Sequence, residues 1–225
     1  MKVCLVTASE LNLAWSEKLD QISKNDLVVF GFNGLGLVSY KKELSGETEY
    51  FQDLAKLSRQ IGSVIVCGCD TDTYGVFRHS CVVADNGKIV GVSDMVHSID
   101  DSEFAPGGSV KVYETSAGRV GIVLKEDLFF PDTLKTLCDC DADVICCIYK
   151  KLSNLMPEVL VRACAFTSGI CTCLCAENYA CVSDIRGNIL IKGCLDLVKA
   201  NAKIEKDYHL IKSKRRGFFR DSDLV

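Results

Sequence analysis

The sequence predicts an α/β protein in which β-strands and helices alternate along the chain. Short apolar runs of strand length recur between segments whose apolar residues have helical spacing, and glycine-containing turns separate several of them. Apolar residues make up 48% of the 225 residues, and neither the 3 prolines nor any long serine- or glycine-rich stretch marks a linker. This composition predicts one compact domain over residues 1–225, which includes a basic C-terminal tail at 212–225.

Charge and hydropathy exclude several classes of protein. The formal net charge of −4 provides no basic surface for nucleic acid, and no segment approaches the roughly 20 apolar residues of a membrane span. The first ten residues, MKVCLVTASE, have strand-like alternation and not the charged and apolar regions of a secretion signal. We therefore expect a soluble, cytoplasmic protein that binds neither nucleic acid nor membranes.

The first half of the chain contains most of the predicted strands. Leu19 and Ile22 have helical spacing, a longer helix follows with its apolar residues on one face, and Asn86–Gly87 is a strong hairpin turn signal. In chain order we predict strand Lys2–Ala8, helix Trp15–Lys24, strand Asp26–Gly31, a glycine-rich connection Asn33–Thr48, helix Glu49–Ile61, strand Ser63–Cys69, and the two hairpin strands Val76–Ala84 and Lys88–Val96.

The second half repeats the alternation. Cys171, Cys173 and Cys175 are spaced to share one face of a strand, and Arg186–Gly187–Asn188 predicts a turn. The predicted elements are strand Val110–Glu114, a buried strand after Gly118, helix Leu134–Cys138, strand Ala142–Tyr149, helix Asn154–Ser168, strand Ile170–Ala176, and the hairpin within Val182–Lys192.

The stretch Gly118–Asp132, GRVGIVLKEDLFFPD, is the most informative part of the sequence. It indicates a glycine turn, a buried strand and a helix that begins near Pro131, a geometry that presents side chains at a strand end. The stretch resembles the nucleophile segment of the nitrilase superfamily of carbon-nitrogen hydrolases, G-[IV]-x-[IL]-C-x-D-x-x-F-P-[DE]. The matching residues are Gly121, Ile122, Leu124, Asp127, Phe130, Pro131 and Asp132. Lys125 replaces the family's nucleophilic cysteine.

Two further segments resemble the family, and in each of them a catalytic residue of the family is replaced. In DLVVFGF, Phe32 takes the position of the family's general-base glutamate, and in GKIVGVSDMVHS, Met95 takes that of its catalytic lysine, whereas His97 matches. The resemblance covers roughly Lys2–Ile211. It implies a four-layer α-β-β-α sandwich whose glutamate, lysine and cysteine are all replaced, so we expect no hydrolysis by the family mechanism.

Lys125 has two interpretations. Beside Phe32 and Met95 it would be partly desolvated, which favours the neutral amine and a role as Schiff-base former or general base. Alternatively, Lys125 pairs with Glu126 or Asp127 and fills the space that the thiol left. The second interpretation is the simpler one.

The fourteen cysteines predict buried, reduced thiols. Their C-x-C pairs lack the C-x-x-C spacing of zinc sites, so we expect no metal and no cofactor. A thiol-rich redox or metal-storage role is a weaker alternative. Cys146–Cys147 differs, because this strand lines the pocket in the family and one of the two must point toward it. The histidines, His79, His97 and His209, are too scattered to indicate a metal site.

Our leading hypothesis is a catalytically degenerate member that works as a small-molecule-binding, regulatory or assembly module. The predicted pocket residues are Phe32, Met95, Lys125, Asp127, Cys147 and Tyr149. Such a pocket would prefer an apolar molecule with one anionic group. The alternative is a hydrolase of amide-type bonds with a rearranged site at Lys125 or Cys147. The resemblance also implies a homodimer, which the basic tail could span.

Overall fold

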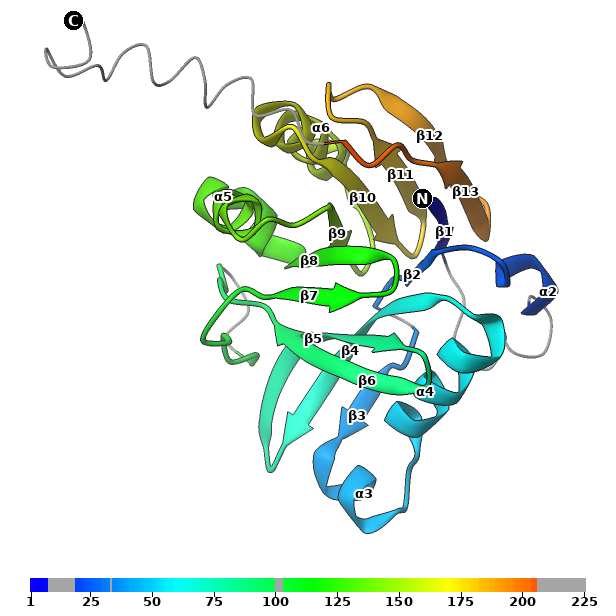
Figure 1. The fold of residues 1–225 in the computed structure, drawn as a ribbon. Coiled ribbons are helices and arrows are strands. Elements are labelled where there is room, and N and C mark those ends of the chain that lie inside the picture. Colours follow the sequence, from blue (N-terminus) through cyan, green and yellow to red (C-terminus); the bar gives the residue numbers. More distant parts are fainter. Residues whose placement is uncertain (8–18, 33, 100–102, 206–225) are drawn as a thin grey trace, which may run out of the picture.

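The computed structural model describes residues 1–7, 19–32, 34–99 and 103–205. Two β-sheets face each other within this part, and helices cover the outer face of each, so the chain forms the predicted four-layer α-β-β-α sandwich (Figure 1). Strands such as β1 (Lys2–Val6) and β9 (Val144–Ile148) are almost continuously buried. A strand covered on both faces needs apolar residues at successive positions, which explains the unbroken apolar runs in the sequence.

The first sheet has the strand order β13-β1-β2-β4-β5-β6, and β3 lies beside the outer half of β4. The pairs β1–β2 and β2–β4 are parallel, whereas β4–β5, β5–β6 and β1–β13 are antiparallel. The strands not yet bounded are β2 (Leu27–Phe30), β3 (Leu37–Ser39), β4 (Val64–Thr73), β5 (Val76–Asp85), β6 (Lys88–Asp94) and β13 (Leu197–Asn201).

The second sheet has the order β12-β11-β10-β9-β8-β7, with β8, β9 and β10 parallel. Its other strands are β7 (Val112–Thr115), β8 (Gly118–Leu124), β10 (Cys171–Ala176), β11 (Tyr179–Ser183) and β12 (Ile189–Gly193). The helical elements are α2 (Leu19–Ile22), α3 (Tyr40–Ser45), α4 (Tyr50–Ile61), the 3-10 helix η1 (Lys125–Phe129), α5 (Pro131–Asp139) and α6 (Met156–Ser168). Among the described helices, none is both long and apolar enough to cross a bilayer.

Three apolar clusters fill the spaces between the layers. One lies between the two sheets, one between the first sheet and α4, and one between the second sheet and α5 and α6. Cys171, Cys173 and Cys175 all lie in the cluster between the sheets, as their alternate spacing predicted. Of the fourteen free cysteines, only Cys140 and Cys194 are exposed. The thiols therefore act mainly as small core residues.

The structure corrects several predicted boundaries. The connection Asn33–Thr48 contains β3 and α3, which are too short to show a periodic pattern. β4 continues past Cys69 to Thr73, because its polar end, CDTDT, pairs with β5. β13 was not predicted. Helix Trp15–Lys24 is described only from Leu19 onward, and the tail 212–225 lies outside the described residues.

Gly68 is a position where β4 lies very close to its neighbours, including Ile148 of the second sheet. A Cβ atom built there would lie 2.7 Å from Ile148 Cγ2 and 2.9 Å from Phe32 Cα. A backbone atom cannot move aside as a flexible side chain can. Only glycine therefore fits at position 68 without a shift of the layers. This contact lies directly beside the strand ends that build the candidate site.

We predict that Gly68→Ala lowers the free energy of unfolding by about 1–3 kcal/mol, because overpacking forces the sheets apart. Chemical denaturation monitored by circular dichroism measures the change. Gly108→Ala is the matched control, since no atom lies within 4 Å of its Cβ position. Equal stability of the two variants would show that the layers adjust freely at Gly68.

Candidate functional site

The candidate site lies where strands of both sheets end. Leu124 at the end of β8 pairs with Ile148 at the end of β9, so the next residues, Lys125 and Tyr149, emerge at the same sheet edge. Carboxyl ends of neighbouring parallel strands commonly build such sites. The facing sheet contributes the outer half of the β4–β5 hairpin to the same region.

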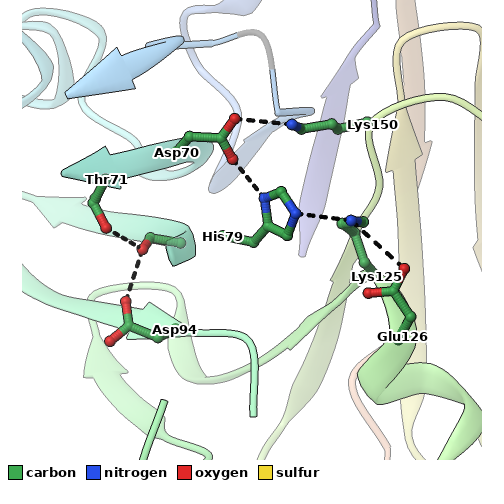
Figure 2. A network of polar contacts seen from close by, with 8 residues as sticks. Asp70, Thr71, His79, Asp94, Lys125, Glu126 and Lys150 are labelled. Atoms are coloured by element: carbon green, nitrogen blue, oxygen red, sulfur yellow. Dashed lines mark hydrogen bonds and ion pairs between the residues drawn. The ribbon is translucent and has the colours of Figure 1, made fainter. Parts of the chain in front are cut away.

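A chain of polar contacts joins the two sheets (Figure 2). Asp70 on β4 lies directly opposite His79 on β5, and its Oδ1 is 2.6 Å from His79 Nδ1. His79 Nε2 is 2.8 Å from Lys125 Nζ, and Lys150 Nζ donates to the other oxygen of Asp70 at 2.8 Å. Lys125 also forms an ion pair with Glu126 at 3.5 Å. We call these five residues the cross-sheet network.

The protons that each group carries determine which group donates in the contact between Lys125 and His79. An ammonium group has no acceptor, so a charged Lys125 donates to Nε2 of a neutral His79, whose Nδ1–H donates to Asp70. Moving one proton from Nζ to Nε2 gives a neutral amine beside an imidazolium, with the same contacts retained. The arrangement of amine, imidazole and carboxylate therefore allows proton exchange between Lys125 and His79 without loss of a hydrogen bond.

Aromatic rings shield His79 from water. The ring of Phe104 stacks on the imidazole at 3.8 Å, and the ring of Phe32 contacts it edge-on at 5.4 Å. His79 is only 1% exposed. Lys150 Nζ lies over both phenyl rings, at 5.7 Å from Phe32 and 5.3 Å from Phe104. Low local polarity strengthens the hydrogen bonds of the imidazole.

Asp70 is the anionic end of the cross-sheet network. Burial disfavours its charged form, but hydrogen bonds from His79 and Lys150 outweigh this effect and hold the pKa of the Asp70 carboxyl below its ordinary value. The carboxylate therefore stays ionised and can orient the imidazole. Asp70 thus has the orienting role that a carboxylate plays beside a histidine base in catalytic triads.

Lys125 has an unusual backbone conformation, with φ at +41° directly after β8. A non-glycine residue in the left-handed region costs on the order of 1 kcal/mol and occurs mostly where the surrounding structure enforces it. The side chain, 15% exposed, reaches between His79 and a pocket of ≈260 Å³. Glu126, Tyr149, Lys150 and Lys151 also line this pocket, together with Phe129, Leu152 and Pro157.

Two buried polar atoms beside the pocket have no hydrogen-bond partner in the described part of the chain, the Tyr149 hydroxyl and Glu126 Oε2. Burial raises the pKa of the Tyr149 phenol, which therefore remains a neutral donor. Unsatisfied buried polar atoms are uncommon, and a bound ligand is one explanation for them. No group of three or more described His, Cys, Asp and Glu side chains is arranged to hold a metal ion.

His79 contacts the Phe32 ring, Lys125 Nζ and the Met95 backbone, and of these three residues Lys125 alone lines the pocket. The Met95 backbone N–H donates to the His79 carbonyl at 2.8 Å, and both Phe32 and Met95 are at most 2% exposed. Tyr149 lines the pocket. The predicted pairing of Lys125 with a neighbouring acid holds for Glu126.

Asp127 and Cys147 lie elsewhere. The Asp127 carboxylate is buried and accepts hydrogen bonds from the backbone N–H groups of Val96 and His97 and from the His97 ring, so it fixes η1 to the segment after β6. Cys147 is packed beneath α5 and α6, and burial raises the pKa of its thiol far above the ordinary value. Cys146 faces the core between the sheets. Neither thiol points into the pocket.

Sequence reasoning missed Asp70, His79 and Lys150. The signal was the two-residue turn Tyr74–Gly75, in which both residues have positive φ. Continuing β4 and β5 to that turn pairs Asp70 with His79. The polar end of β4 concealed this register, because polar residues next to glycine are usually assigned to a loop.

We predict that Asp70→Asn reduces the loss of stability in acid. A carboxyl whose pKa is lowered by folding contributes stability above its unfolded value near ~3.9, and the contribution disappears as pH falls through the folded value. Urea unfolding at a series of pH values from neutral to acid measures this. The wild-type curve should fall more steeply below about pH 5 than the variant curve. Asp139→Asn removes one exposed charge as a control, and parallel curves for wild type and Asp70→Asn would refute the assignment.

Solved structures of known proteins share this fold. The chain superposes on Nit3 of Saccharomyces cerevisiae, a member of branch 10 of the nitrilase superfamily, with a TM-score of 0.73 and 18% identity over 96% of this chain and 93% of the other. A carbon-nitrogen hydrolase of Helicobacter pylori G27 gives 0.74 and 16% over 99% and 96%. The NitN amidase of Nesterenkonia sp. AN1 gives 0.75 and 14% over 97% and 100%. At these identities the similarity establishes the fold.

Sequence comparison gives the family. A Schizosaccharomyces pombe protein described as a probable nitrilase is 24% identical over 116 residues, a match that spans 49% of this chain and 43% of that relative. The family model for carbon-nitrogen hydrolase matches residues 6–199, which include the whole cross-sheet network. The chain therefore belongs to the carbon-nitrogen hydrolase family.

Proposed function

We propose that this protein is a non-hydrolytic member of its family that binds a small anionic molecule beside Lys125. The observation that carries the proposal is the lysine itself, which occupies the family's nucleophile position and bonds to His79 at 2.8 Å. A positive side chain at the inner end of a small pocket is suited to recognising a carboxylate. The network behind Lys125 holds that side chain in place.

The chemistry of an amine argues against turnover. In the family, a thiolate attacks an amide or nitrile carbon and forms a thioester, which water then cleaves. Attack by Lys125 on an amide would give another amide, as resistant to hydrolysis as the substrate. Phe32 and Met95, at the positions of the family's glutamate and lysine, have no proton to exchange. Loss of hydrolysis is therefore the interpretation that best fits these residues.

The pocket lining indicates the ligand class. Lys125, Lys150 and Lys151 face a single Glu126, which gives the lining a positive balance, while Phe129, Leu152 and Pro157 provide apolar contacts. A volume of ≈260 Å³ suits a small metabolite. We infer a compact ligand with a carboxylate or similar anionic group and an apolar body.

A hydrolase with a rearranged site is the second candidate. It is favoured by one observation, that His79 is a base within hydrogen-bond reach of Lys125 and is itself held by Asp70. Cys147 is a poor nucleophile for such a site, because it is fully buried under the helices. This alternative depends on Lys125 alone.

We predict that Lys125→Met weakens binding of small carboxylates by roughly 10- to 100-fold, since a hydrogen bond to a charged group contributes about 1.5–3 kcal/mol. Isothermal titration calorimetry with a panel of short-chain carboxylates measures this. Lys135→Met, on the exposed side of α5, removes the same charge as a control.

Equal affinity of wild type and Lys125→Met would contradict the proposed role of the lysine. The same proteins should be assayed for ammonia release from amides, ureido acids and nitriles. We expect none. Release that Lys125→Met abolishes would favour the rearranged hydrolase.

We further propose that the protein forms a homodimer through α6. Val159 and Phe166 lie seven residues apart on its exposed face, and Met156 adds to the same apolar stripe. Apolar side chains in this arrangement commonly mark a protein–protein interface.

Val159→Glu should weaken the dimer roughly tenfold or more by placing a charge in a desolvated interface. Light scattering over a concentration series measures the monomer–dimer equilibrium. Val90→Glu, at an exposed position of β6, is the control. A wild-type chain that stays monomeric at all concentrations would refute this interface.

A further inference from the structure

We propose that Lys125 forms a reversible imine with ligands that carry a ketone or aldehyde next to their carboxylate, as 2-oxo acids do. The inference rests on the proposed function and specifies its ligand class. It follows from three features of the site: a base that can take a proton from the amine, an unused donor for a carbonyl oxygen, and lysines for the carboxylate. The first two are not needed to bind a simple carboxylate.

The first feature is the order of groups in the cross-sheet network. Lys125 Nζ, His79 Nε2, His79 Nδ1 and Asp70 Oδ1 form one continuous line, with contacts of 2.8 Å and 2.6 Å (Figure 2). A nucleophile, a base and an orienting carboxylate in this order are the general arrangement for activating a weak nucleophile. A lysine needed only for its charge would be satisfied by Glu126 alone.

The second feature is Tyr149, which lines the pocket and whose buried hydroxyl has no hydrogen-bond partner in the described chain. Burial raises the pKa of this phenol, so it retains its proton and can donate to a carbonyl oxygen. Donors placed where negative charge develops stabilise carbonyl addition. Tyr149 directly follows β9, and Lys125 directly follows β8, its parallel neighbour.

The third feature is the positive lining beyond Lys125. Lys150 and Lys151 contribute to the pocket wall, and Lys150 is 41% exposed while it bonds to Asp70. An ammonium group has three donors, so Lys150 retains donors for a ligand carboxylate. A carboxylate held there would keep its neighbouring carbonyl carbon within the pocket that Lys125 also lines.

The step balances without any co-reactant. Lys125 as an ammonium transfers one proton to His79 Nε2, and the resulting amine attacks the carbonyl carbon. The new C–N bond forms as the C–O π electrons move to oxygen, which takes the proton from His79 to give a carbinolamine. The nitrogen then loses a second proton to His79, and the hydroxyl group leaves with that proton as water. The products are one protonated imine and one water, with the starting charge conserved.

The experiment is reductive trapping of the full chain with sodium cyanoborohydride and pyruvate or 2-oxoglutarate. Peptide mass spectrometry should locate a ligand-dependent secondary amine on Lys125. Lys125→Arg should lose this adduct, because a guanidinium does not form it, whereas Lys135→Met should retain it. His79→Gln keeps a hydrogen-bonding group but cannot relay the proton, so we expect adduct formation roughly 100-fold slower.

Binding of lactate, which has the same carboxylate but no ketone, separates the two proposals. Calorimetry that shows both acids bound with no adduct on Lys125 would overturn the imine and leave the proposed function intact. No binding of either acid would overturn both. Adducts spread evenly over exposed lysines, or unchanged in Lys125→Arg, would show that Lys125 is not the reacting amine.

Discussion

The register between β4 and β5 is the constraint on which the candidate site depends. It places Asp70 opposite His79, and with them the acceptor and the imidazole that meet Lys125 from the facing sheet. A shift of one residue in β5 would turn His79 to the opposite face of the hairpin, away from Asp70. The tight turn Tyr74–Gly75 fixes this register, and Gly68 allows the same strand to lie close to Phe32.

Lys125, a partly buried lysine directly after β8, requires compensation that a thiol would not. A partly buried ammonium is costly unless acceptors surround it. His79 and Glu126 provide those acceptors, and Asp70 completes the chain of charge and hydrogen bonds. The phenyl rings of Phe32 and Phe104 enclose the imidazole. They occupy positions in which charged groups would compete for its protons. Lys125, its acceptors, Asp70 and the two phenyl rings therefore form one set of mutually dependent contacts.

The sequence predicted most of the sandwich, because continuously apolar strands and the Asn86–Gly87 turn are local signals. Elements set by long-range pairing were missed. β13 has little apolar patterning of its own and is ordered by pairing with β1, nearly two hundred residues away. The site was predicted only in part. Lys125 and Tyr149 directly follow strands that the sequence predicts. The role of His79 depends on Asp70, which lies in a polar segment that resembles a loop in the sequence.

The cross-sheet network has a mechanical consequence. Asp70 and His79 belong to one sheet, and Lys125 and Lys150 extend from the other, so the hydrogen bonds that build the site also fasten the two halves of the sandwich. A ligand that moves Lys125 away from His79 breaks one of these hydrogen bonds between the sheets, while it adds contacts of its own. Ligand occupancy of the pocket and the stability of the contact between the two sheets are therefore thermodynamically linked. Binding at Lys125, as proposed above, would therefore alter the stability of the whole sandwich and not only the contacts of the pocket.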